Sequence, residues 1–133
     1  MLLTGCHDRG REHHREGADP SRVEEHVKKG VDRLLKKVDA TDEQRQKVYA
    51  LRDRIMPDIV GLAKDREATM KEIQELWKQP TLDAAKLNAL VDQRADQLKT
   101  LAHKLADVAK EFHDILTPEQ REKLGRMGER SCE

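Results

Sequence analysis

The stretch from Thr41 to Leu116 decides the fold, and most of its first half reads QKVYALRDRIMPDIVGLAKDREATMKEIQELW (residues 46–77). Apolar residues recur there at steps of three or four: Val48, Leu51, Ile55, Ile59, Leu62, Met70, Ile73 and Trp77. This spacing places them on one face of a helix, and only Arg66 interrupts the face. Pro57 lies inside the arm, where it lacks a backbone donor, so a bend is expected there. The sequence therefore predicts one long, bent helix.

A second helical arm follows after a short break. Its apolar residues keep a heptad-like step: Ala84, Leu87, Val91, Leu98, Leu101, Leu105, Val108, Phe112 and Ile115, with Arg94 among them. The break is Lys78-Gln79-Pro80-Thr81, in which Pro80 stops the first helix and Thr81 is the expected cap of the second. Each arm would be roughly 50 Å long at ~1.5 Å per residue, so it needs a partner along its length. We predict an antiparallel helical hairpin.

Residues at equal distances from the turn define a register for this hairpin. The expected pairs are Trp77 with Ala84, Met70 with Val91, Leu62 with Leu98, Ile55 with Leu105 and Val48 with Phe112. The same register sets Arg66 level with Arg94, and two guanidiniums in an apolar seam are costly without partners. We therefore expect at least one arginine to face water and to pair with a nearby carboxylate. The candidates are Asp65, Glu67, Asp92 and Asp96.

Shorter helices flank the hairpin. Asp19-Pro20 is a helix start, and the apolar residues from Val23 to Val38 form a face that should dock on the hairpin. Thr41 with Gln44, and Thr117 with Gln120, are spaced as capping boxes, in which each side chain binds a free N–H at a helix start. The second box carries Pro118 at the first helical position and begins a short final helix.

Composition excludes several classes of protein. Charged residues make up 39% and aromatic residues 2%, which is typical of helices and coiled coils and argues against a β-sandwich or a Rossmann sheet. Basic and acidic residues number 26 each, so no net field attracts nucleic acid. The chain lacks a recognisable catalytic motif or phosphate loop, and no run approaches the ~18 apolar residues of a membrane span. We predict an all-α protein that is not an enzyme and needs no cofactor.

The residues Leu116-Thr117-Pro118-Glu119-Gln120 match the LTxxQ motif of the Spy/CpxP group of bacterial periplasmic proteins. Ala40-Thr41-Asp42-Glu43-Gln44 resembles the same motif with Ala in place of Leu. The resemblance implies a curved, all-helical homodimer in the periplasm that binds unfolded proteins without ATP or modulates an envelope-stress partner, such as a sensor kinase or an anti-sigma factor. It also implies an alternative, because a sister branch senses or buffers zinc, nickel or cobalt.

The N-terminus resembles a second known pattern. Leu3-Thr4-Gly5-Cys6 is similar to the lipobox of bacterial lipoproteins, which makes Cys6 a candidate for lipidation after a truncated signal. We expect residues 1–19 to be a tether, residues 20–128 a helical domain and residues 129–133 a flexible tail.

Metal binding through soft ligands is the first alternative function. The candidate ligands for zinc or nickel are His7, His13, His14 and Cys132. The histidines of the helical part are not spaced three or four apart, as a site on one helix face requires. A purely structural coiled-coil adaptor is the second alternative.

Client binding is the favoured function, and four residues are its candidate site: Met56, Arg66, Met70 and Arg94. Methionine repacks against different apolar shapes, and arginine supplies adaptable polar contacts. Such residues suit a surface that accepts many unfolded partners.

Overall fold

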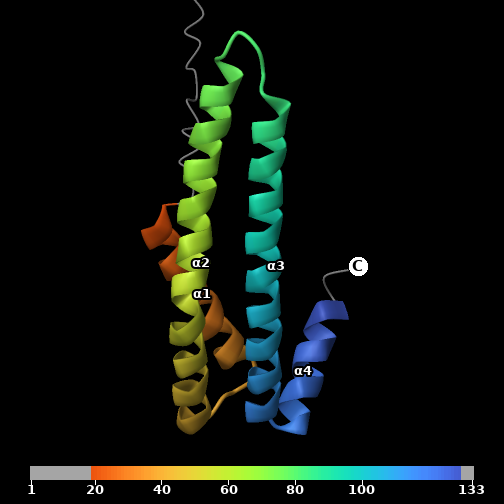
Figure 1. Ribbon diagram of the computed structural model, residues 1–133. Helices are drawn as coiled ribbons and strands as arrows, with labels where there is room; N and C mark the ends of the chain where they lie inside the picture. The colour runs from red at the N-terminus through yellow and green to blue at the C-terminus, as the bar shows by residue number, and fades with distance from the viewer. Residues whose placement is uncertain (1–18, 130–133) are drawn as a thin grey trace, which may run out of the picture.

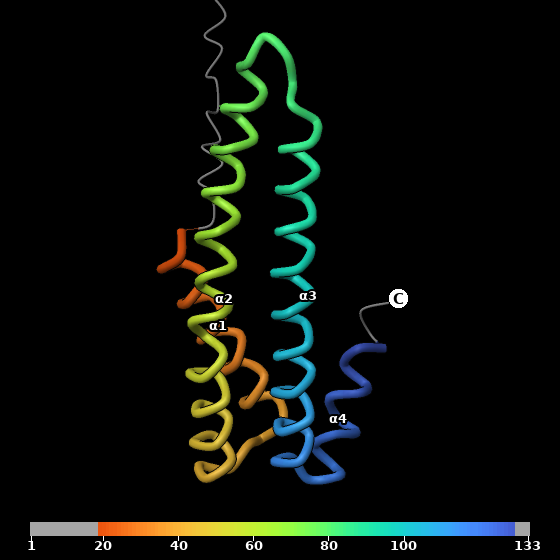
Figure 2. Tube along the Cα trace, viewed as in Figure 1, coloured from red at the N-terminus to blue at the C-terminus, as the bar shows by residue number. Residues whose placement is uncertain are grey.

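Four helices make up the described part of the chain in the computed structural model, which covers residues 19–129 (Figure 1). They are α1 (Pro20–Lys37), α2 (Asp42–Trp77), α3 (Ala84–Ile115) and α4 (Pro118–Glu129). Residues 19–129 contain no strand, so the predicted all-α class is confirmed. The long helices α2 and α3 lie side by side as an antiparallel hairpin, with α1 and α4 beside its open end (Figure 2).

Helix α1 begins as the sequence predicts. Asp19 is its N-cap and accepts a hydrogen bond from the backbone N–H of Ser21 at 3.0 Å, with Pro20 at the first helical position. The helix starts near the middle of α2 and packs down along it towards the hairpin's open end, and Asp19 and Pro20 share a cavity with Met70 higher on α2. Its apolar side is therefore used against the lower half of α2.

The hydrophobic core lies at the open end of the hairpin. Its buried members are Leu35, Val38, Val48, Leu51, Ile55, Met56 and Leu116. Helix α3 itself has no buried side chain, and α2 has none beyond Met56. Within residues 19–129, the upper half of the hairpin is thus a single layer of two helices, and apolar side chains there stay exposed.

Polar bonds between α2 and α3 confirm the predicted register. Lys104 Nζ donates to Asp58 Oδ1 at 2.6 Å, and Gln97 Nε2 donates to Asp65 Oδ2 at 3.1 Å. Nearer the open end, Arg54 pairs with Glu111 through both of its terminal nitrogens. The Arg54 guanidinium holds the pKa of the Glu111 carboxyl below its usual range. The pairs Lys104 with Asp58 and Gln97 with Asp65 lie at nearly equal distances from the turn, as the register predicts, whereas Arg54 and Glu111 are offset by about one helical turn.

The N-cap of α3 differs from the prediction. Asp83, not Thr81, caps this helix: its Oδ1 accepts a hydrogen bond from the backbone N–H of Lys86 at 3.1 Å. A carboxylate at this position satisfies a free N–H and also complements the positive end of the helix dipole. Thr81 instead lies exposed in the loop.

Replacing each candidate cap in turn tests this assignment. Asp83→Ala should lower the free energy of unfolding by about 1 kcal/mol, the usual cost of losing an N-cap. Thr81→Ala should change it by less than about 0.5 kcal/mol, because an exposed loop side chain is removed. Urea unfolding followed by circular dichroism measures both, and a larger loss for Thr81→Ala would contradict the assignment.

Helix α1 ends with a left-handed residue that is not glycine. Asp39 has φ of 52°, and the N–H of Ala40 donates to the carbonyl of Leu35 at 3.0 Å. These are features of a Schellman motif, and Asp is one of the few residues that tolerate its conformation. The turn leaves Val38 in the core, only 2% exposed, and brings the chain to Thr41 at the start of α2.

Helix α2 passes through Pro57 without ending. The residue is exposed, so its ring needs no space in the core, and the helix continues with one backbone hydrogen bond fewer. The bend expected at Pro57 stays a prediction. Helix α2 therefore provides one continuous wall of the hairpin from Asp42 to Trp77.

Candidate functional site

Both predicted capping boxes are present. At the start of α2, Thr41 N–H donates to Gln44 Oε1 at 3.0 Å, and Gln44 N–H donates to Thr41 Oγ1 at 3.2 Å. At the start of α4, Thr117 N–H donates to Gln120 Oε1 at 2.9 Å, and Gln120 N–H donates to Thr117 Oγ1 at 3.3 Å. Each motif thus satisfies two free N–H groups of its own helix.

The two motifs also bind each other, which the sequence analysis missed. Gln44 Nε2 donates to Gln120 Oε1 at 2.7 Å, and Gln120 Nε2 donates to Gln44 Oε1 at 2.9 Å. The second proton of each amide goes to a helix end: Gln44 Nε2 to the carbonyl of Ile115, and Gln120 Nε2 to that of Val38, both at 3.1 Å. We call this pair the glutamine clasp. Each amide nitrogen donates twice and each amide oxygen accepts twice.

The glutamine clasp ties the starts of α2 and α4 to the ends of α3 and α1. Such a network is stabilising because every half-buried polar group in it has a partner. Leu116, the apolar residue of the second motif, is only 4% exposed in the core. Ala40, which precedes Thr41 as Leu116 precedes Thr117, is half-buried. Val38, two residues before Ala40, is buried in the core. The motif residues therefore form a structural joint at the open end of the hairpin.

A protein-family comparison matches the part of the chain that contains this joint. The model of the LTXXQ motif family protein matches residues 26–128, which include both motifs and the hairpin between them. The chain belongs to the LTXXQ motif family. No curated protein and no solved structure matches the chain. The LTXXQ family is a periplasmic, chaperone-type family without enzymatic activity, which agrees at that coarse level with the resemblance found in the sequence.

An open cavity of about 450 Å³ lies on the upper hairpin between α2 and α3. We call it the apolar groove. Its lining residues are Arg66, Thr69, Met70 and Ile73 from α2, and Leu90, Val91, Arg94, Ala95 and Leu98 from α3. Three of its apolar side chains are about half exposed: Met70 by 48%, Val91 by 57% and Leu98 by 50%. Large apolar side chains gathered in this way mark a surface for binding.

The two arginines meet at this groove, as the register predicted, but their expected carboxylate partners are wrong. Arg94 is half-buried, and its Nη1 donates to the carbonyl of Leu62 at 2.9 Å and to Gln97 Oε1 at 3.4 Å. A helix carbonyl keeps a second lone pair, so it can accept this bond without a buried carboxylate. Gln97 then reaches Asp65, and Arg66 is exposed with no hydrogen bond or ion pair to any residue from 19 to 129.

One of the four predicted client-binding residues does not lie in the groove. Met56 is only 7% exposed and belongs to the core at the open end of the hairpin. Ile55, which precedes it, is also only 7% exposed, so both residues are buried at this level of α2. The prediction of an accessible Met56 is therefore wrong, whereas Arg66, Met70 and Arg94 lie together.

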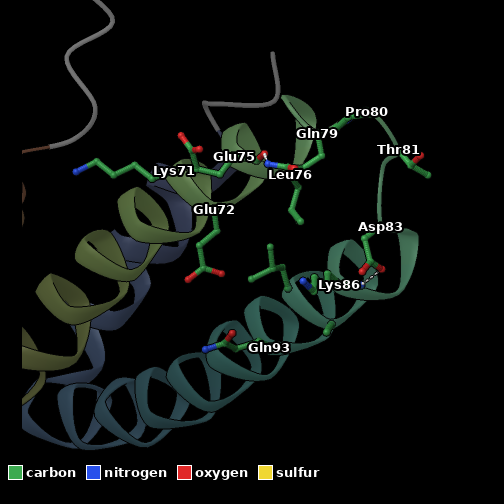
Figure 3. Close-up of a pocket in the computed structure, with 12 residues that line it drawn as sticks. Lys71, Glu72, Glu75, Leu76, Gln79, Pro80, Thr81, Asp83, Lys86 and Gln93 are labelled. Carbon is green, nitrogen blue, oxygen red and sulfur yellow. Dashed lines mark hydrogen bonds between the residues drawn. The ribbon is translucent and has the colours of Figure 1, made fainter.

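A larger cavity of about 900 Å³ lies near the hairpin turn (Figure 3). Figure 3 shows Glu72 and Leu76 of α2 pointing towards the space between the two helices. Charged residues of both signs surround it, among them Lys71, Glu75 and Lys86. Mixed charges of this kind are typical of a solvated helix surface and select no particular ligand.

The remaining candidate features are metal ligands, a lipidation site and membrane spans. Within residues 19–129, no three His, Cys, Asp or Glu side chains are grouped so that they could hold a metal ion. The predicted ligands His7, His13, His14 and Cys132, and the lipidation candidate Cys6, lie outside the described residues. None of the described helices is long and apolar enough to cross a bilayer.

Proposed function

We propose that this protein binds unfolded or misassembled envelope proteins in the periplasm without ATP, and that the apolar groove is the binding surface. One observation carries the proposal: in a chaperone-type family, Met70, Val91 and Leu98 are about half exposed in one groove. A folded domain exposes such a group at a cost in solubility, so a ligand that covers it is the natural explanation.

The shape of the groove favours weak and rapid binding. It is open to solvent along the hairpin, so a client side chain placed in it stays partly hydrated and gains only part of the free energy of full burial. Met70 can adapt to clients of different shape. A chaperone without a nucleotide cycle needs such modest contacts, because release depends on dissociation alone.

A homodimer is part of the proposal. Within residues 19–129 no side chain of α3 is buried, and Leu105 of this helix is 41% exposed outside the apolar groove. A long helix is stabilised mainly by the packing of its apolar side, so a second copy of the chain is the expected cover for this part of α3. Sedimentation at micromolar concentration should therefore show a dimer, whereas a folded monomer would contradict this part of the proposal.

Aggregation of a chemically denatured test protein tests the function directly. Light scattering is followed after dilution from denaturant, with and without the purified protein at equal molar amounts and without nucleotide. The proposal expects slower and weaker scattering when the protein is present. Unchanged scattering would overturn it. In that case tight zinc or nickel binding through His7, His13, His14 and Cys132 would favour the metal alternative, and neither activity would favour the adaptor.

A further inference from the structure

Helix α1 shows what kind of segment the hairpin face can hold. It packs on α2, its residue Leu35 and its C-cap residue Val38 are 0% and 2% exposed, and Tyr49 Oη of α2 donates to Asp32 Oδ1 of α1 at 2.8 Å. Apolar contact at the centre and a polar bond at the edge are how amphipathic helices dock in grooves. The lower half of this face therefore already binds a helix.

The apolar groove continues the same face beyond the start of α1. Asp19 and Pro20 at that start share a cavity with Met70, and Met70 also lines the groove. Where α1 stops covering α2, Met70 becomes 48% exposed, whereas Ile55 lower on α2 is 7% exposed. The uncovered upper part thus adjoins a helix-binding surface of the same protein.

The electrostatics of the groove add a second requirement. Among the lining residues that belong to the described part of the chain, Arg66 and Arg94 are the only charged ones, and none is a carboxylate. Arg94 already donates to Leu62 and Gln97, but Arg66 has no hydrogen bond or ion pair within the described part of the chain. A carboxylate on the edge of a bound segment would give Arg66 a partner. It would not be repelled by another carboxylate in the groove lining.

We propose that the apolar groove binds client segments as amphipathic helices whose apolar stripe is flanked by carboxylates. This inference rests on the proposed function and names its substrate class. The bound segment would present aliphatic residues three or four apart to Met70, Val91 and Leu98, as α1 does lower on the face. Its Asp or Glu side chains, one helical turn from that stripe, would pair with Arg66.

Trp77 provides the readout for this inference. It is the single tryptophan of the chain, lies seven residues after Met70 on the same side of α2, and is 76% exposed. A bound peptide without tryptophan should shift its emission to shorter wavelength as water leaves the ring. Circular dichroism of the same mixtures reports whether the peptide becomes helical.

Three synthetic peptides, each with the 18-residue length of α1, separate the effect of the apolar stripe from that of the flanking charges. The first carries leucine at helical spacing with flanking glutamates, the second has the same composition in scrambled order, and the third has lysines in place of the glutamates. We expect the first to bind saturably and to gain helix. The scrambled peptide should bind about tenfold more weakly because its apolar residues no longer share a face. The lysine peptide should bind about threefold more weakly, as exposed charge pairs contribute little.

A charge reversal in the groove provides the matched test. In Arg66→Glu, the preference for the glutamate peptide over the lysine peptide should reverse, whereas Lys64→Glu should leave it unchanged. Lys64 is exposed on the same helix but does not line the groove, so the two variants carry the same change of charge. Sedimentation of both variants checks that their oligomeric state is that of the wild-type protein.

The outcomes distinguish this inference from the proposed function. Equal binding of the ordered and scrambled peptides, or a preference that Arg66→Glu does not alter, would overturn the helix proposal. If scattering by a denatured protein is still suppressed, the proposed function survives that result, whereas unchanged scattering removes both. Peptide binding that occurs only as a dimer dissociates would assign the groove to a second copy of the chain, and would also overturn the inference.

Discussion

Gln120→Glu is expected to lower the free energy of unfolding by about 3 kcal/mol at neutral pH, the largest effect of any single change considered. In the wild-type protein, Gln120 Nε2 donates to Gln44 Oε1 and to the carbonyl of Val38. An ionised glutamate has no proton to donate, so both acceptors lose their partner and face a negative charge at short distance. Gln44 cannot turn its amide to compensate, because its Oε1 also accepts the bond from Thr41 N–H.

The loss of unfolding free energy in Gln120→Glu, relative to the wild-type protein, should depend on pH. The folded state favours the protonated form of the introduced glutamate, which keeps one donor for Val38 or Gln44. The pKa of that carboxyl is therefore raised in the folded protein, and folding takes up a proton. Stability relative to wild type is then highest below the unfolded-state pKa and falls as the pH rises through the folded-state pKa. Urea unfolding at several pH values measures this trend.

Gln46→Glu is the matched control for the clasp. Gln46 is exposed on α2, two residues from the clasp residue Gln44, so the same chemical change should cost less than about 0.5 kcal/mol and show little dependence on pH. If Gln120→Glu unfolds at the same urea concentration as Gln46→Glu at neutral pH, the glutamine clasp does not stabilise the joint. Equal slopes of the two unfolding curves would show that the comparison concerns stability alone.

The clasp also marks the limit of what the sequence could predict. The sequence predicts the helices and both capping boxes because these depend on residues within one helical turn of each other. It also predicts the hairpin register, which is counted from the single break between the two long helices. Gln44 and Gln120 are 76 residues apart, and a capping pattern says nothing about the second proton of each amide. Their mutual bond requires the folded hairpin to bring both motifs to one end.

Met56 and Asp83 show two other causes of error. The sequence predicts an accessible Met56 for clients, but this side chain is 7% exposed in the core at the open end, where α1 packs on α2. Asp83 and Thr81 are both good caps, and the structure uses the charged one. Arg66 and Arg94 were placed correctly because the register alone fixes their level. The spacing of apolar residues predicts neither where α1 packs nor which of two possible N-caps a helix uses.

Removing the exposed apolar side chains of the groove should have the largest effect on function. The double variant Met70→Ser with Val91→Ser is expected to weaken binding of a denatured test protein about tenfold or more, because partial burial of two such side chains contributes roughly 1.5–3 kcal/mol. Both residues are about half exposed, so the free energy of unfolding should change little. Serine keeps the net charge, which leaves the contribution of Arg66 and Arg94 unaltered.

Leu82→Ser with Ala85→Ser is the control for that loss. Leu82 is 41% exposed near the hairpin turn, and neither residue lines the groove, so general surface hydrophobicity falls without a change at the proposed site. Light scattering should show that the control suppresses aggregation as the wild-type protein does, while the groove variant requires about tenfold more protein for the same suppression. If the two variants lose suppression of aggregation equally, any exposed apolar residue of the hairpin can bind clients. The groove between α2 and α3 would then not be the specific client-binding surface.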